Sequence, residues 1–270
     1  MDRVCLITGG ARGIGRATAR LAGAAGYAVA VGCRAGTGTA EAVVSEIANG
    51  GGRAVAIQAD VAEETDVLRM FDEAERRLGP ITALVNAAGV SHRGRVADFA
   101  AADLGRIVAV NVVGLMLCCR EAVRRMSTRA GGQGGAIVNV SSMAATMGGR
   151  PGASAYAASK AAVDTFSTGL AKEVVAEGIR VNVVRPGATR TDMTARMHED
   201  PEVRAEVEAT IPMHRFGEAH EVAAAIMWLL SDQASFVSGA HLDVSGGGLV
   251  VAAGHADHPP RVSQAGDRGT

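Results

Sequence analysis

The chain has 270 residues, of which 48% are hydrophobic and only 3% aromatic, and its formal net charge is −1. This length and apolar content suit one large α/β domain or two small ones. A near-neutral chain without a basic stripe lacks the electrostatic footprint of a nucleic-acid-binding protein. An apolar strand follows directly after Met1-Asp2-Arg3, so we expect neither a signal peptide nor a membrane span.

Short runs rich in Val, Ile, Leu and Ala alternate with longer amphipathic runs along the whole chain. The short runs predict strands at residues 3–8, 27–33, 53–59, 83–86, 136–141, 179–185 and 241–244. The longer runs predict helices at residues 13–25, 39–49, 63–78, 104–127, 154–177 and 218–231. This alternation predicts an α/β fold: a doubly wound, seven-stranded, mostly parallel sheet with helices on both faces. No long linker divides the chain, so we expect a single domain over residues 1–248.

Two segments depart from this alternation. Residues 190–217 are polar and Met-rich, with a short helical stretch around 201–209, and a loop of this length is typical of a functional lid or of disorder. Residues 249–270 are rich in Gly, Ala, Asp and Pro without periodicity, which predicts a disordered tail.

The cysteines carry no metal-binding or disulfide pattern. They are scattered as Cys5, Cys33, Cys118 and Cys119, with no CxxC motif. The last two are adjacent in an apolar helical run, where small core side chains are the expected role. We therefore expect no metal site, and a reducing, cytoplasmic location.

A glycine-rich loop, Thr8-Gly9-Gly10-Ala11-Arg12-Gly13-Ile14-Gly15, joins the first predicted strand to the first helix. Glycines let backbone N–H groups approach a phosphate, and the helix N-terminus adds partial positive charge at the same place. The spacing is G-x3-G-x-G and not the usual G-x-G-x-x-G dinucleotide fingerprint. Taken alone, the loop leaves open a nucleotide site or a plain strand–helix turn.

Tyr156 and Lys160 lie four residues apart in a predicted helix, so they project from one face, one turn apart. A nearby ammonium lowers the pKa of a phenol, which would let the tyrosine exchange a proton near neutral pH. The pair therefore predicts acid/base chemistry, although a lone YxxxK also occurs by chance.

The motifs together resemble the short-chain dehydrogenase/reductase family. In order along the chain they are Thr8-Gly-x-x-x-Gly-Ile-Gly15, Asn86-Ala-Ala-Gly89, Asn111, Ser142, Tyr156-x-x-x-Lys160 and Pro186-Gly187. The resemblance spans residue 3 to about residue 248 and is strongest to bacterial 3-oxoacyl-carrier-protein reductases and glucose dehydrogenases. It implies a Rossmann-type fold, a nicotinamide cofactor, a small-molecule carbonyl or alcohol substrate and a homotetramer.

The resemblance also assigns the catalytic roles. Tyr156 would move the proton at the substrate oxygen, and Lys160 would lower the tyrosine pKa and hold the nicotinamide ribose. Asn111 would hold a water that relays protons from Lys160, the alternative being an asparagine satisfied in the core. Ser142 would orient the substrate oxygen. The family usually places this serine one residue nearer to the tyrosine, but residue 143 is methionine, which cannot serve. Ser142 is therefore kept, with Ser141 as the alternative.

The expected cofactor contacts are Gly9, Arg12, Gly13, Ile14, Gly15, Arg34, Asp60, Val61, Asn86, Ala87, Gly89, Tyr156, Lys160, Pro186, Gly187, Thr189 and Thr191. In this set Asp60-Val61 resembles the pair that contacts adenine, and Asn86 is interpreted as mainly architectural.

The charge at the end of the second strand indicates which cofactor is used. An NAD enzyme usually carries a carboxylate there for the ribose 2′-OH. Here the segment reads Val31-Gly32-Cys33-Arg34, with no carboxylate before Glu41. Arg12 and Arg34 could instead bind a 2′-phosphate, unless both are simply exposed solubilising arginines. We expect NADP, with NAD use still open.

The function predicted from the sequence is an NADP-dependent oxidoreductase that interconverts a carbonyl and an alcohol, the carbonyl being a ketone or 3-oxoacyl compound. A dehydrogenase oxidising sugars or secondary alcohols is the alternative. A non-catalytic nucleotide-binding regulator is the remote one, and the intact Ser142, Tyr156 and Lys160 argue against it. No nucleic acid or membrane partner is expected.

Overall fold

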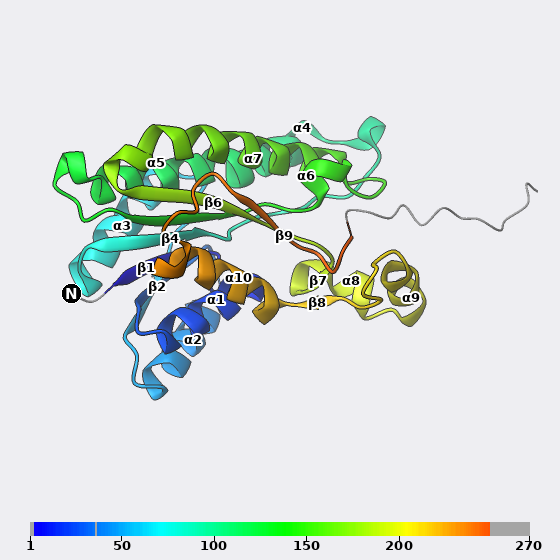
Figure 1. Cartoon of the computed structure of the whole chain (residues 1–270). Helices are drawn as coiled ribbons and strands as arrows, with labels where there is room; N and C mark the ends of the chain where they lie inside the picture. Colours follow the sequence, from blue (N-terminus) through cyan, green and yellow to red (C-terminus); the bar gives the residue numbers. More distant parts are fainter. Residues whose placement is uncertain (1–2, 36, 249–270) are drawn as a thin grey trace, which may run out of the picture.

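The computed structural model describes residues 3–35 and 37–248. Its centre is a seven-stranded sheet in the order β3-β2-β1-β4-β5-β6-β9, and every neighbouring pair of strands is parallel (Figure 1). The strands are β1 (Val4–Thr8), β2 (Ala28–Cys33), β3 (Ala54–Gln58), β4 (Ile81–Asn86), β5 (Gly135–Val140), β6 (Ile179–Pro186) and β9 (His241–Val244). The predicted fold class is confirmed.

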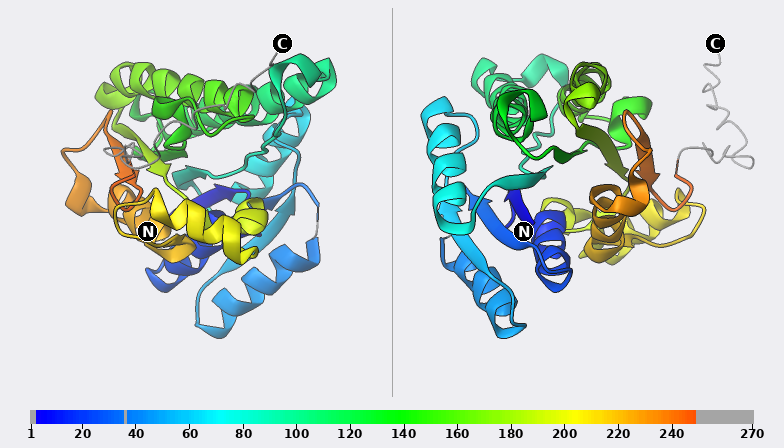
Figure 2. Two further views of the ribbon diagram at one scale, coloured as in Figure 1. Left: turned by 90° about the vertical axis from the view of Figure 1, so that its right-hand side faces the viewer. Right: turned by 60° about the vertical axis from the view of Figure 1, so that its left-hand side comes forward.

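Helices cover both faces of this sheet (Figures 1 and 2). One face carries α1 (Gly13–Ala24), α2 (Thr37–Asn49) and α10 (Ala219–Leu230); the other carries α3 (Glu64–Leu78), α5 (Leu115–Met126) and α7 (Ser154–Val174). Each face buries its own apolar core, and β1 and β2 are buried along their whole length. Strands covered on both sides read as continuous apolar runs, which is why the sequence revealed them.

The predicted helix 104–127 is a composite of three elements. It begins earlier, with α4 (Ala101–Val108), continues through the π-helix η2 (Ala109–Gly114), and ends with α5. By length and mean hydropathy (1.7), the run Ala101–Met126 could cross a membrane. A core helix meets the same criterion, and this one buries residues such as Cys118 and Met126 in the core on its side of the sheet.

The segment after β6 holds more structure than the sequence predicted. The expected helix is present as α9 (Pro201–Ala209), where the Asp200 side chain caps the N-terminus and proline occupies the first turn. The unpredicted elements are β7 (Thr189–Arg190), which pairs with β8 (Gly217–Glu218), η5 (Asp192–Thr194) and α8 (Ala195–His198). A small core of Val207, Ile211 and Phe216 holds this segment together.

The remaining short helices are η1 (Val96–Asp98), η3 (Thr128–Ala130), α6 (Ala144–Met147), η4 (Val175–Glu177) and η6 (Asp232–Ala234). The tail predicted at 249–270 lies outside the described residues.

The strand order fixes where a ligand can bind. The order reverses between β1 and β4, so the chain leaves these neighbouring strands toward opposite faces of the sheet. In open α/β sheets the crevice at the carboxyl ends of such strands binds the ligand. The glycine loop follows β1 and the Asn86 motif follows β4, so both predicted motifs lie at this switch point.

Candidate active site

The glycine loop after β1 packs tightly against the loop after β4. Gly9 and Gly13 have φ values of 66° and 49°, in the left-handed region that glycine adopts most readily. A Cβ on Gly9 would lie 2.8 Å from the backbone of Ala88, so a larger residue does not fit. The Ala88 N–H donates to the Thr8 hydroxyl at 3.2 Å and fastens the two loops. The cradle suits a pyrophosphate, since α1 begins directly at this turn.

Ile14 and Gly15 form the first turn of α1, as expected. A Cβ on Gly15 would lie 2.3 Å from the carbonyl oxygen of Gly9, so this turn also requires glycine. The Ile14 carbonyl accepts a hydrogen bond from Thr18 at 2.8 Å, and its side chain packs on the adjacent core. Both residues therefore shape the loop more than they offer side chains to a ligand.

Asn86 is an architectural residue at the end of β4. Its Nδ2 donates to Asn139 Oδ1 on the neighbouring β5 at 2.9 Å, in a fully buried setting. The Ala87 N–H then donates to the Thr8 carbonyl at 3.2 Å. These contacts link the carboxyl ends of the three adjacent strands β1, β4 and β5.

Asn111 lies in the π-helix η2, a rare geometry often found at functional sites. Its amide is completely engaged: Oδ1 accepts from Val90 N at 2.9 Å, and Nδ2 donates to Val90 O at 2.9 Å and to Ser159 Oγ at 3.0 Å. The Ser159 hydroxyl in turn donates to the carbonyl of Tyr156 at 2.7 Å. The side chain is thus satisfied in the core and ties η2 to the helix that carries the tyrosine.

The two consecutive serines after β5 point to different surroundings. Ser141 is buried and donates to the Lys160 carbonyl at 3.1 Å, which braces α7. The Ser142 hydroxyl accepts from Ala144 N at 3.1 Å and lies near enough to the Tyr156 phenol to lower its pKa. Of this pair Ser142 is the serine that acts on the phenol, which favours the predicted residue over its alternative.

Tyr156 and Lys160 project from the same side of α7, with the ammonium 5.8 Å from the ring centroid. Burial raises the pKa of Tyr156 above its ordinary value of 10, and the nearby Ser142 hydroxyl offsets this only in part. The prediction that the lysine lowers this pKa is therefore wrong for the protein alone. Helical spacing brought the two side chains together, but loss of hydration is the largest effect on the phenol.

Lys160 is almost completely buried, and its ammonium donates to the Val140 carbonyl at 2.8 Å. Burial lowers the pKa of Lys160 from 10.5 to about 8, while the carboxylate of Asp164 acts in the opposite direction. Gly89 leaves room beside it, because a Cβ there would lie 3.6 Å from the ammonium and 3.5 Å from Asn111 Oδ1. The residues of the predicted catalytic set thus converge on one place.

The predicted adenosine side of the crevice carries two exposed arginines, Arg12 before α1 and Arg34 directly after β2. Neither side chain forms an ion pair or hydrogen bond within the described part of the chain. The Asp60 carboxylate, in contrast, is held by Arg106 at 2.8 Å and accepts from Ala62 N at 3.0 Å. Val61 beside it is buried.

The loop after β6 closes the crevice opposite the glycine loop. A Cβ on Gly13 would lie 3.1 Å from the Thr191 methyl group, so the two loops are in near contact. Pro186 is the last residue of β6, and Gly187 packs so closely on Ser245 that a Cβ would lie 2.8 Å from it. The Thr189 hydroxyl donates to the Gly187 carbonyl at 3.1 Å, so its side chain serves the loop itself.

Sequence reasoning missed several residues that build this site. Thr8, Ser159 and the Val140 carbonyl each orient a predicted residue, and Asp164 lies one helical turn beyond Lys160. Only Asp164 had a visible signal, because it extends the four-residue spacing of Tyr156 and Lys160 along the same helix.

The chain is similar to known proteins in sequence and in fold. A family profile described as Enoyl-(Acyl carrier protein) reductase matches residues 9–248. The chain is 48% identical over 245 residues to an uncharacterized oxidoreductase, YgfF, of Escherichia coli (strain K12), covering 90% of this chain and 99% of that one. It is 42% identical over 247 residues to the 3-oxoacyl-[acyl-carrier-protein] reductase of Homo sapiens, covering 92% and 98%.

A solved structure of a short-chain dehydrogenase from Burkholderia cenocepacia J2315 in complex with NADP superposes with a TM-score of 0.84 at 34% identity. The match covers 92% of this chain and 97% of that one.

Fold, site and comparisons together define a nicotinamide-dependent oxidoreductase. The chain belongs to the short-chain dehydrogenase/reductase family, and it is an NAD(P)-dependent enzyme that acts on CH–OH groups.

Proposed function

We propose that this enzyme is an NADPH-dependent reductase of a ketone or 3-oxoacyl-type carbonyl compound. The observation that carries the proposal is the arrangement around Tyr156: its half-buried ring lies 5.8 Å from the Lys160 ammonium, and its phenol, with a raised pKa, lies beside the hydroxyl of Ser142. A protonated phenol is the form that donates to a carbonyl oxygen, as reduction requires.

The bound nicotinamide would supply the hydride. Ser142 and Tyr156 would both hydrogen-bond the substrate oxygen, and the tyrosine would give up its proton as negative charge develops there. Lys160, whose ammonium is oriented by the Val140 carbonyl, would stabilise the resulting phenolate and hold the cofactor ribose. Asn111 would act mainly by positioning the loop at Val90 and the helix that carries the tyrosine.

The preference for NADPH is supported by the two exposed arginines beside the switch point. Arg34 stands directly after β2, where an NAD enzyme usually carries a carboxylate. A 2′-phosphate there would gain charge-assisted hydrogen bonds from Arg34 and Arg12. The NADP complex of the Burkholderia relative supports the same choice.

Steady-state assays test the proposal directly. NADPH and NADH consumption is followed at 340 nm against acetoacetyl thioesters, diketones, aryl ketones and aldehydes. Turnover with NADPH that Tyr156→Phe lacks supports the reductase. If neither cofactor is consumed but sugars or secondary alcohols drive NAD(P) reduction, the enzyme is the oxidising dehydrogenase. Binding of cofactor without turnover in either direction would contradict both.

We further propose that the enzyme is cytoplasmic and a homotetramer, assembled through the α4–η2–α5 run, α7 and the β9 edge. Large apolar side chains are exposed on two of these surfaces, among them Val108 on α4 and Phe236 beside the β9 edge.

A further inference from the structure

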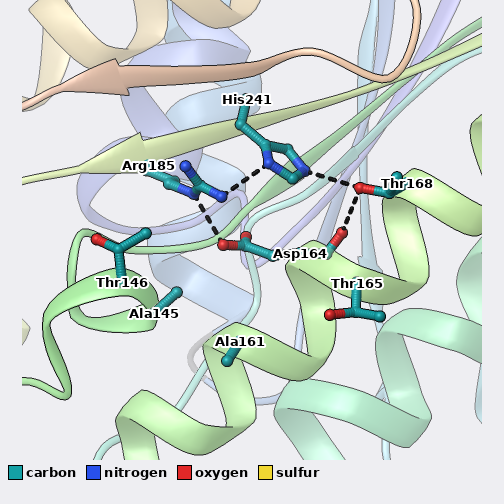
Figure 3. Close-up of a pocket in the computed structure, with 8 residues that line it drawn as sticks. All are labelled: Ala145, Thr146, Ala161, Asp164, Thr165, Thr168, Arg185 and His241. Atoms are coloured by element: carbon teal, nitrogen blue, oxygen red, sulfur yellow. Dashed lines mark hydrogen bonds and ion pairs between the residues drawn. The ribbon is translucent and has the colours of Figure 1, made fainter.

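A group of charged residues lies behind the catalytic helix, on the side toward the edge strand β9. Figure 3 shows it around a cavity of about 270 Å³ between α6, α7, β6 and β9. Asp164 from α7, Arg185 from β6 and His241 from β9 point toward one another there, and only Asp164 lies next to a residue of the active site.

Asp164 is buried, and only one of its carboxylate oxygens is hydrogen-bonded. Its Oδ2 accepts from Arg185 Nε at 2.8 Å, whereas its Oδ1 has no partner within residues 3–35 and 37–248. A buried carboxylate oxygen without a donor is costly, so such a residue calls for an explanation beyond packing.

Arg185 does not need Asp164 for its own neutralisation. Its Nη1 lies 3.6 Å from the Asp243 carboxylate on β9, which can also balance the charge of the guanidinium. A simple ion pair with Arg185 therefore does not explain why the Asp164 carboxylate is buried here. Arg185 Nη2 also lies 2.7 Å from His241 Nδ1, and His241 Nε2 lies 3.2 Å from the Thr168 hydroxyl.

The direction of these bonds fixes the state of the histidine. The Thr168 hydroxyl donates its proton to the backbone carbonyl of Asp164 at 3.0 Å. The Thr168 oxygen must therefore accept the hydrogen bond from His241 Nε2. His241 Nδ1 then accepts from Arg185, so the ring is neutral and acts as a brace. The Arg185 guanidinium is thus held by His241 and Asp243, and its Nε in turn fixes the Asp164 carboxylate.

Asp164 lies four residues after Lys160, a spacing that places two side chains one turn apart on the same helical face. The charged and titratable groups around Lys160 are Tyr156 and Asp164 on α7; η2 contributes the neutral amide of Asn111, and β5 the Val140 carbonyl. Among the described residues, Asp164 is the carboxylate that acts on the buried ammonium, and it opposes the effect of burial.

We propose that Asp164 is a positioning residue for the catalytic lysine: held by Arg185 and His241, its carboxylate keeps the buried Lys160 ammonium charged. The inference rests on the proposed function, in which a charged Lys160 holds the ribose and stabilises the phenolate. The carboxylate oxygen without a hydrogen-bond donor then has a role, since Asp164 lies one turn from Lys160 on the same face of α7.

The sequence offers an unusually direct test, because Lys160 and Lys172 are its only two lysines. Protein labelled with ¹³C at lysine Cε gives two signals, and Lys172, exposed near the end of α7, is the internal reference. The Lys160 signal of the wild type, free of cofactor, should titrate near pH 8. In Asp164→Asn it should titrate about one pH unit lower, the size of effect expected when a nearby opposite charge is removed.

The matched control is Asp243→Asn, which removes the other carboxylate beside Arg185. It should leave the Lys160 titration within about 0.3 pH units of wild type, because it acts from β9 and not from α7. Asp164→Glu, which keeps the charge, should restore the titration. If Asp164→Asn does not fold, Asp164→Ser removes the same charge and leaves a hydroxyl for Arg185 to bond.

The affinity for NADPH, measured by cofactor fluorescence across pH, should then begin to fall at a lower pH in Asp164→Asn than in the wild type. The shift should match that of the Lys160 signal. An unchanged Lys160 titration in Asp164→Asn overturns the inference, and so does an equal shift in Asp164→Asn and Asp243→Asn. Failure of the wild type to bind or turn over NADPH would contradict the proposed function alone, since the lysine titration is read without cofactor.

Discussion

At the residue scale, the catalytic pair illustrates how burial competes with charge. The pKa of Tyr156 is raised although an ammonium lies nearby, and the pKa of Lys160 is lowered to about 8. Both shifts favour the uncharged form, as desolvation does. The protein alone therefore holds a proton donor in place, and full activation of the tyrosine is left to the bound state.

Tyr156→Phe should abolish turnover while the affinity for NADPH changes little, because only the proton-carrying oxygen is removed. The chain contains one other tyrosine, Tyr27, which is buried in the core beneath Arg3 and far from the chemistry in the fold. Tyr27→Phe is thus the matched control and should keep its turnover. Substantial activity in Tyr156→Phe would rule out the acid/base role.

The lowered pKa of Lys160 also predicts how stability depends on pH. Between pH 8 and 10.5 the unfolded chain holds a proton on this lysine that the folded protein lacks, so the free energy of unfolding rises with pH in this window. At about 1.4 kcal/mol per pH unit, the full effect is about 3 kcal/mol.

Lys160→Met removes the titrating group and should remove this rise. Urea denaturation of wild type and variant at several pH values measures the difference, in which the other titrating groups largely cancel. Parallel pH dependences for the two proteins would show that Lys160 has its ordinary pKa in the fold.

Arg34→Ala should weaken NADPH binding by about 1–3 kcal/mol, the value of a charged hydrogen bond to the 2′-phosphate, and leave NADH nearly unchanged. Arg16→Ala, an equally exposed arginine one turn into α1, is the control that should affect neither cofactor. Fluorescence titration with both cofactors makes the comparison. Equal losses for NADPH and NADH would show that Arg34 does not read the 2′-phosphate.

At the element scale, the π-helix η2 connects the loop and the helix that form the site. Asn111 holds both backbone groups of Val90 and the hydroxyl of Ser159, so it links the loop after β4 to α7. Asn111→Ala should lower the free energy of unfolding by about 2–4 kcal/mol, because it leaves two buried backbone groups unpaired. Ser159→Ala, which removes one of these partners, should cost about 1 kcal/mol. Equal small losses in denaturation experiments would contradict this role.

The strands and long helices were predictable because their apolar periodicity is local. The π-helical segment was not, since nothing in Val110-Asn111-Val112 distinguishes it from α-helix until it packs on its neighbours. The two-residue strands β7 and β8 and the four-residue helices α6 and α8 are too short for any period to be read. In the site, spacing predicted which side chains meet but not how deeply each is buried, so the direction of the Tyr156 pKa was missed.

At the scale of the whole molecule, the outer surface is informative about assembly. Val108 and Val113 are 49% and 44% exposed along the outer side of the α4–η2 run, and Phe236 beside the β9 edge is fully exposed. Apolar side chains grouped on a surface commonly mark an interface between chains. β9 also pairs only with β6 in the described chain, which leaves one edge of the sheet open.

Light scattering after size exclusion should therefore give about four times the 27.4 kDa of one chain. Val108→Glu and Phe236→Glu should each reduce the assembly to a dimer, because each places a carboxylate in only one of two different interfaces. Val96→Glu, at an exposed apolar residue of the short helix η1, is the control that should leave the mass unchanged. If the wild type elutes as a monomer, these apolar surfaces serve another partner. If both variants remain tetrameric, the subunits meet through faces other than the α4–η2 run and the β9 edge.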